Sequence, residues 1–156
     1  MQLQAGMDAP QFELFDADME PFSLVAQLGK NNIVLYFYPK DDTPGCTMEA
    51  NEFSALDDSF VQLDTLVVGV SRDECLSHAE FRDKYGLSVL LLSDAESRVC
   101  KKYGVLFDKD VDGHKTAAIQ RSTFVIDKQG KLRHALYGVH AHGHAYEILN
   151  LIRKLK

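Results

Sequence analysis

No apolar run in the sequence approaches the roughly 20 residues that are needed to cross a bilayer. The first residues, Met-Gln-Leu-Gln-Ala-Gly, have neither the basic region nor the apolar core of a signal peptide. A compact basic patch is also missing, and a net charge of −6 argues against a protein that binds nucleic acid. These absences predict a cytoplasmic protein that binds neither membranes nor nucleic acid.

Cysteine is scarce, and the spacing of the cysteines does not indicate a metal site. The three cysteines form no CxxC pair and no zinc-binding spacing. We therefore expect thiols that are either reactive or inert, without structural disulfides. Linkers, repeats and low-complexity segments are absent as well, so residues 1–156 are expected to form one domain.

One stretch near the N-terminal third stands out. Ile33–Tyr38 is an unbroken apolar run of the kind found in a strand that is buried on both faces. Pro39 ends it, and Lys40–Gly45 is a polar loop. Apolar residues then recur at the spacing of one helix face: Met48, Phe53, Leu56 and Phe60. Cys46 is therefore predicted to lie at the start of a helix that follows a central strand.

This position has chemical consequences for the Cys46 thiol. Unpaired amide groups and the positive end of the helix dipole favour an anion there, so we expect the thiol to ionise more easily than a free one. Ligands of open α/β sheets also bind outside the carboxyl ends of strands. The alternative is a small buried apolar residue, as free cysteines often are. The preceding Pro44-Gly45 favours the reactive thiol, because it holds Cys46 on a turn with backbone rather than bulky side chains beside it.

Strand and helix patterns alternate along the rest of the chain. Strands are expected at residues 63–70, 87–92, 121–127 and 131–137, with a short one around Phe12 and Leu14. Helices are expected over 74–85, after the capping-box sequence Ser93–Glu96, and at the end of the chain. Ser71 or Asp73 would cap the first of these. Residues 107–120 are polar without a clear period, which indicates a loop. The pattern predicts an α/β sheet with helices on both faces and an antiparallel edge.

The segment from Pro39 to Glu49, Pro-Lys-Asp-Asp-Thr-Pro-Gly-Cys-Thr-Met-Glu, resembles the active-site loop of peroxiredoxins of the bacterioferritin-comigratory (peroxiredoxin Q) group. Further segments resemble that family in the same order: Gly69–Asp73, Lys84–Leu87, Leu92–Asp94, Lys102–Val105 and Arg121–Asp127. The resemblance implies a thioredoxin-like fold with a central mixed sheet flanked by helices. It also implies reduction of hydrogen peroxide or organic hydroperoxides.

The resemblance assigns roles that the residues alone leave open. Cys46 would attack the peroxide, and Thr43 would hold it, although Thr43 is equally an ordinary turn residue. Pro39 would shield the thiolate, although by itself it is a strand terminator. Arg121 would lower the pKa of Cys46 and bind the peroxide oxygen as it becomes anionic. Without the resemblance, an arginine at the start of a strand is usually a surface residue. Glu49 would help to hold the arginine.

The implied reaction oxidises Cys46 to a sulfenic acid, which thioredoxin or another thiol reduces. No metal or organic cofactor is needed, and the protein is expected to be a monomer or a homodimer. The family's second cysteine is missing, since Asn51 and Arg82 stand where relatives carry it. Cys75 is a candidate resolving thiol, and Cys100 is interpreted as a core residue.

Two other functions are compatible with parts of the sequence. A thioredoxin-like disulfide reductase would need a cysteine beside Cys46, which the loop lacks. A non-enzymatic metal-binding or chaperone-like protein could use His140, His142 and His144, although this tract is also typical of a polar loop before a helix.

Overall fold

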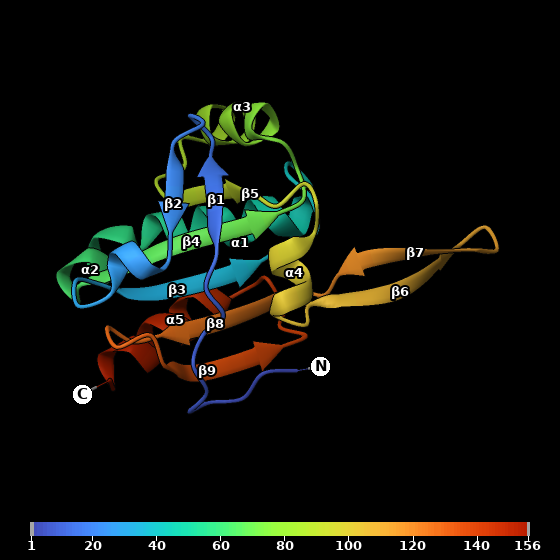
Figure 1. Ribbon diagram of the computed structural model, residues 1–156. Helices are drawn as coiled ribbons and strands as arrows, with labels where there is room; N and C mark the ends of the chain where they lie inside the picture. The colour runs from blue at the N-terminus through green and yellow to red at the C-terminus, as the bar shows by residue number, and fades with distance from the viewer. Residues whose placement is uncertain (1, 156) are drawn as a thin grey trace.

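The computed structural model describes residues 2–155. Its largest element is a seven-stranded sheet with the strand order β2-β1-β5-β4-β3-β8-β9 (Figure 1). The strands are β1 (Glu13–Asp16), β2 (Pro21–Ser23), β3 (Asn32–Phe37), β4 (Thr65–Ser71), β5 (Leu90–Ser93), β8 (Ser122–Ile126) and β9 (Leu132–Tyr137). The central strands β3, β4 and β5 are parallel, and antiparallel strands flank them on both sides. The predicted mixed sheet is confirmed.

Helices cover both faces of this sheet, as predicted. They are α1 (Pro44–Ala55), α2 (Asp57–Gln62), α3 (Cys75–Tyr85), α4 (Arg98–Lys102) and α5 (His144–Arg153), with a 3-10 turn η1 (Val25–Gln27). Residues of α1, α2, α3 and α5 share one core with Val34 and Tyr36 of β3. The alternate residues Ile33 and Leu35 point into a second core, which α4 and the N-terminal segment cover. Among the described residues, no helix is long and apolar enough to span a membrane.

The expected loop at residues 107–120 is wrong. It is a hairpin of β6 (Leu106–Val111) and β7 (His114–Ile119), which extends away from the body of the molecule (Figure 1). Most of its residues are exposed, so no buried face imposes an apolar–polar alternation on the sequence. The turn residues Asp112 and Gly113 both have positive φ, and the Asp-Gly pair was the signal that could have predicted it.

The details of the helix starts also differ from the prediction. The helical pattern after Cys46 is divided into α1 and α2 at Leu56, and Met48 is 43% exposed. Neither Ser71 nor Asp73 caps α3, which begins after Glu74 without a side-chain cap. The helix after Ser93–Glu96 begins only at Arg98. The Asp94 carboxylate accepts hydrogen bonds from the backbone N–H groups of two residues in this helix.

Those residues are Val99 and Cys100, whose backbone N–H groups donate to Asp94 at 3.3 and 2.8 Å. The N-cap residue is Ser97, which makes no side-chain cap hydrogen bond, so the predicted capping box is wrong and Asp94 bonds to the first turn of α4 instead.

The carboxyl ends of the three parallel strands meet at one edge of the sheet, where the chain passes into α1, α3 and the segment before α4. Strand β8 runs antiparallel to β3, with Ser122 opposite Phe37, the last residue of β3. Arg121 comes immediately before Ser122, so the register brings it to the same edge as Cys46. This edge is where the candidate site lies.

Candidate active site

Cys46 is the third residue of α1, as the sequence predicted, and only 2% of it is exposed. Thr43 is the N-cap residue with an extended backbone (φ −91°, ψ 156°), and Pro44 occupies the first helical position. The Thr47 N–H donates to the Thr43 carbonyl at 2.8 Å, which closes the first turn around Cys46. The sulfur is therefore fixed at the positive end of a helix and largely shielded from water.

Arg121 contacts the sulfur and a buried carboxylate at once. Its Nη2 lies 3.5 Å from Cys46 Sγ, and its Nη1 donates to Glu49 Oε1 at 2.6 Å. Gly45 allows this approach, because a Cβ atom there would lie 3.2 Å from Nη2. Burial alone would lower the pKa of the Arg121 guanidinium, but the neighbouring Glu49 and Cys46 outweigh it and raise that pKa. Arg121 is thus a permanent cation at the site.

Glu49 is one turn after Cys46 on α1, and its side chain is fully buried. Burial raises the pKa of this carboxyl to about 7, and the attraction of Arg121 opposes that rise. Its second oxygen, Oε2, has no hydrogen-bond partner among the described residues. The Glu49 carboxyl therefore binds the guanidinium through one oxygen, although burial makes the ionised form of this carboxyl unfavourable.

Thr43 and Pro39 are close to Cys46 in sequence but are not part of this contact group. The Thr43 hydroxyl donates to the Lys40 carbonyl at 2.9 Å, across the loop. Pro39 is exposed just beyond β3. The structure thus brings Cys46, Arg121 and Glu49 together, and it places Thr43 at the helix cap and Pro39 on the surface of the same loop.

The other two cysteines lie in different surroundings, and all three are free. Cys100 is fully buried in the core on the opposite face of the sheet from Cys46, which confirms it as a core residue. Burial, with a contribution from Asp94, raises the pKa of its thiol and keeps it protonated. Cys75 is half-buried and lines a cavity of about 390 Å³ that Cys46 does not line. Its role as a resolving thiol stays a prediction.

The three histidines of the tract form no metal-like grouping among the described residues. His144 is buried, and its Nε2 lies 2.7 Å from the Thr123 hydroxyl, whereas His140 and His142 are exposed. All three line one cavity of about 660 Å³, but α5 begins at His144 and turns this side chain inward. The one metal-like grouping among the described residues lies elsewhere and consists of Asp41, Asp73 and His78.

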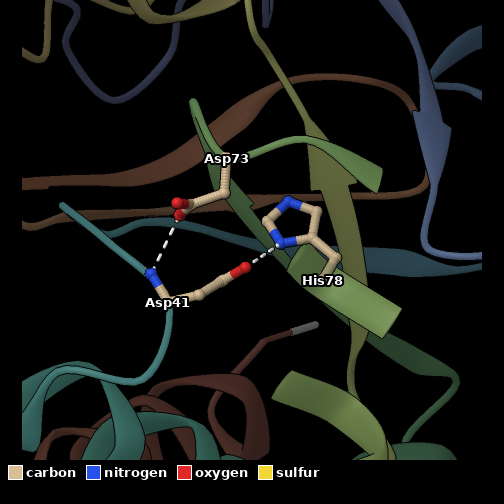
Figure 2. A group of neighbouring side chains, drawn as sticks. All are labelled: Asp41, Asp73 and His78. Carbon is tan, nitrogen blue, oxygen red and sulfur yellow. Dashed lines mark hydrogen bonds and ion pairs between the residues drawn. The ribbon is translucent and has the colours of Figure 1, made fainter. Parts of the chain in front are cut away.

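That group was missed at the sequence level. His78 lies on α3 among polar neighbours, a pattern that indicates a surface residue, yet it is completely buried. Its ring lies beside Asp41, which belongs to the loop that leads to Cys46 (Figure 2). Only the alignment of the parallel strands brings these two residues together.

The raised pKa of Glu49 predicts a specific dependence of stability on pH. Folding favours the protonated carboxyl, so this contribution is complete below about pH 4.5 and is lost as the pH rises through about 7. Glu49→Gln keeps the shape but cannot ionise. From pH 5 to pH 8, we expect the free energy of unfolding of Glu49→Gln to rise relative to that of the wild type by on the order of 3 kcal/mol.

Urea unfolding at both pH values measures this difference. The exposed Glu80 on α3 supplies the control, since Glu80→Gln is expected to shift stability equally at both pH values. Parallel pH profiles for the wild type and Glu49→Gln would contradict the assignment.

The chain is similar to known proteins in sequence and in structure. The profile of the AhpC/TSA family matches residues 5–135. A bcp relative from Helicobacter pylori strain J99 is 43% identical over 148 residues, which are 95% of this chain and 97% of the relative. Peroxiredoxin Bcp of Bacillus subtilis is 39% identical over 155 residues, 99% of this chain and 98% of its own length.

Solved structures agree with the sequence relatives. A mutant PrxQ from Xylella fastidiosa superposes with a TM-score of 0.91 at 33% identity and covers 98% of this chain and 97% of its own. BcpB from Mycobacterium tuberculosis gives 0.88 at 31% identity, with 99% of each chain covered. The thioredoxin-like fold is therefore confirmed. The chain belongs to the AhpC/TSA family and, within it, to the Bcp and peroxiredoxin Q group of thiol-dependent peroxidases.

Proposed function

We propose that Cys46 is the residue of this peroxiredoxin that reacts with peroxide and is oxidised by it. The Cys46 thiolate attacks one peroxide oxygen, so that an S–O bond forms as the O–O bond breaks. The sulfur supplies the electron pair and becomes a sulfenic acid, and the other oxygen leaves and takes up a proton as water or alcohol. The 3.5 Å approach of Arg121 Nη2 to the sulfur supports this assignment most directly, since it is a hydrogen bond from a cationic side chain, and no described residue makes one to the sulfur of Cys75 or Cys100.

The neighbours of Cys46 have roles that follow from charge and position. Arg121 stabilises the thiolate, and its remaining donors suit the oxygen that becomes negative as the O–O bond breaks. The amide groups of the first turn of α1 act in the same sense. Thr43, at the helix cap, would turn its hydroxyl from the Lys40 carbonyl to a peroxide oxygen. Pro39 would limit access of water once a peroxide is bound.

The substrate class is hydrogen peroxide and organic hydroperoxides. The Xanthomonas campestris bacterioferritin comigratory protein has alkyl peroxide reduction activity, and it superposes on this chain with a TM-score of 0.86 at 34% identity. A thiol must then reduce the sulfenic acid. Thioredoxin or a small thiol fits this need, because no described cysteine is paired with Cys46. A cytoplasmic monomer or homodimer, without nucleic-acid or membrane partners, stays part of the proposal.

The two alternative functions receive no support from the geometry. A disulfide reductase requires a second thiol next to Cys46, but the Cys46 sulfur contacts the Arg121 guanidinium, and neither Cys75 nor Cys100 is paired with it. A metal-binding protein built on the histidine tract requires His140, His142 and His144 to converge, and His144 is instead held by Thr123.

Replacing Cys46 tests the proposed role. Cys46→Ser should reduce peroxide consumption at least about a thousandfold, because a serine hydroxyl is a far weaker nucleophile at neutral pH. The matched variant Cys75→Ser should consume one equivalent of peroxide at the wild-type rate. A stopped-flow single turnover, with circular dichroism to verify folding, measures both. Substantial peroxide consumption by folded Cys46→Ser would remove Cys46 from the mechanism.

Replacing Arg121 tests the electrostatic part. Arg121→Ala should slow the single turnover about 100- to 1,000-fold, by analogy with the loss of one oxyanion donor. Arg121→Lys keeps the charge but not the planar fork, so it should fall between Ala and the wild type. The control is Arg133→Ala on β9, whose side chain pairs at 3.7 Å with Asp127. If Arg121→Ala reacts as fast as Arg133→Ala, the role of the guanidinium is refuted.

A further inference from the structure

A buried polar cluster lies at the carboxyl edge of the sheet, outside the contact group of Cys46. It consists of Asp41, Asp73 and His78, which Figure 2 shows, together with Tyr38. All but Asp73 are fully or almost fully buried. Buried polar groups of this kind are costly unless they are satisfied, so their presence next to the Cys46 loop requires an explanation.

Hydrogen bonds join the two central members to each other and to their surroundings. His78 Nε2 lies 2.8 Å from the Leu92 carbonyl, which can only accept, so this nitrogen carries a proton. Asp41 accepts from the hydroxyls of Tyr38 at 2.6 Å and Ser77 at 2.8 Å. His78 Nδ1 is 2.7 Å from the same carboxyl group, so a further hydrogen bond joins the two side chains. The result is a buried, hydrogen-bonded His78–Asp41 pair.

This pair fixes the backbone of the loop after β3. The Asp41 N–H donates to Asp73 Oδ2 at 2.8 Å, so the loop is joined to the segment after β4 as well as to α3. The next residue, Asp42, has a positive φ of 59°, and its carboxylate accepts from Lys84 and Tyr85 near the end of α3. Helix α3 thus holds the loop at two points, of which the His78 contact is the buried one.

The fixed loop determines where α1 begins. Two residues separate Asp41 from the helical Pro44, and the Thr43 hydroxyl closes the loop by donating to Lys40. The Thr43 carbonyl in turn accepts the first-turn hydrogen bond from Thr47. A displacement of Asp41 would therefore move the first turn of α1 and with it the Cys46 sulfur, which contacts the guanidinium at 3.5 Å.

We propose that His78 and Asp41 are positioning residues for the peroxidase reaction, and that the hydrogen bond between them holds the Cys46 loop in its reactive geometry. This inference rests on the proposed function of Cys46. Neither residue touches the sulfur; they act through the loop and the first turn of α1. Geometry at a reacting centre is sensitive, since a misplacement of about 1 Å can reduce a rate about 100-fold.

A metal ion is the competing explanation for the cluster. Atoms of Asp41, Asp73 and His78 lie within 4.8 Å of one another, which is compatible with a cation. However, His78 Nε2 is bonded to the Leu92 carbonyl, His78 Nδ1 to Asp41, and Asp73 Oδ2 to the Asp41 N–H and the Ser71 hydroxyl, so each group already has a partner within the protein. The hydrogen bonds therefore favour a pair without a metal, and metal content becomes one outcome of the test.

The experiment uses the variants His78→Gln, Asp41→Asn and Tyr38→Phe in the full chain. Two rates are measured for each: peroxide consumption in a single turnover, and alkylation of Cys46 by iodoacetamide as a function of pH. Both rates should fall in His78→Gln and Asp41→Asn, the peroxide rate by about tenfold or more. Because the two residues act as one unit, the double variant should lose little more than either single variant. Tyr38→Phe removes one hydrogen bond to Asp41 and should show a smaller loss in the same direction.

The control is Asp94→Asn, another buried carboxylate, which bonds to the first turn of α4 and does not contact the loop. It should lower the unfolding midpoint but leave both rates within twofold of the wild type. If His78→Gln fails to fold, Tyr38→Phe decides between the same outcomes.

Wild-type rates in folded His78→Gln and Asp41→Asn would overturn the inference. So would stoichiometric zinc in the purified wild type that is absent from Asp41→Asn. The alkylation assay needs no peroxide, so the positioning role is tested even if the proposed peroxidase function fails.

Discussion

The Cys46 sulfur, the Arg121 guanidinium and the Glu49 carboxyl form one contact group in which every charge is largely removed from water. A buried cation needs a partner, and here it has two: an acid that is held with a pKa of about 7 and a thiol that can become an anion. The guanidinium contacts the carboxyl through Nη1 and the sulfur through Nη2, so it can compensate a charge on either group. Stability and reactivity therefore depend on the same contact.

The sheet supplies the geometry for this contact. The parallel strands β3, β4 and β5 end at one edge, and the antiparallel register of β8 brings Arg121 to that edge from a segment 75 residues away in the chain. The loop between β3 and α1 then needs a fixed conformation, which Gly45 allows and the buried His78–Asp41 pair stabilises. The site is thus assembled at one end of the sheet, from the start of α1 and the residue before β8, with α3 supporting the loop that leads to α1.

Much of this fold could be predicted from local patterns, because they reflect local physics. Every residue of Ile33–Tyr38 is buried, and most of this run forms strand β3. A strand that is buried on both faces has a continuous apolar sequence, which is why it could be predicted. Cys46 at the helix start followed from the proline, the glycine and the change of period. The hairpin at 106–119 was missed because it extends into solvent and has no buried face, so burial left no period in its sequence.

The site was harder to predict, because its members meet only through tertiary register. Arg121 was identified by family resemblance alone, and nothing local distinguishes it from a surface arginine. His78 lies on a helix whose composition is polar, and its burial depends on the neighbouring ends of β3 and β5. Sequence periodicity carries no information about such pairings across strands.

The most direct test of the account is to find which sulfur a peroxide oxidises. The reduced protein would receive one equivalent of hydrogen peroxide, with and without a sulfenic-acid trap, followed by peptide mapping by mass spectrometry. The account predicts that the trapped sulfenic acid is on Cys46, while Cys100 stays a thiol. If Cys46 remains unmodified while Cys75 or Cys100 is oxidised, the contact between Cys46 and Arg121 does not create the reactive thiol, and the central claim is wrong.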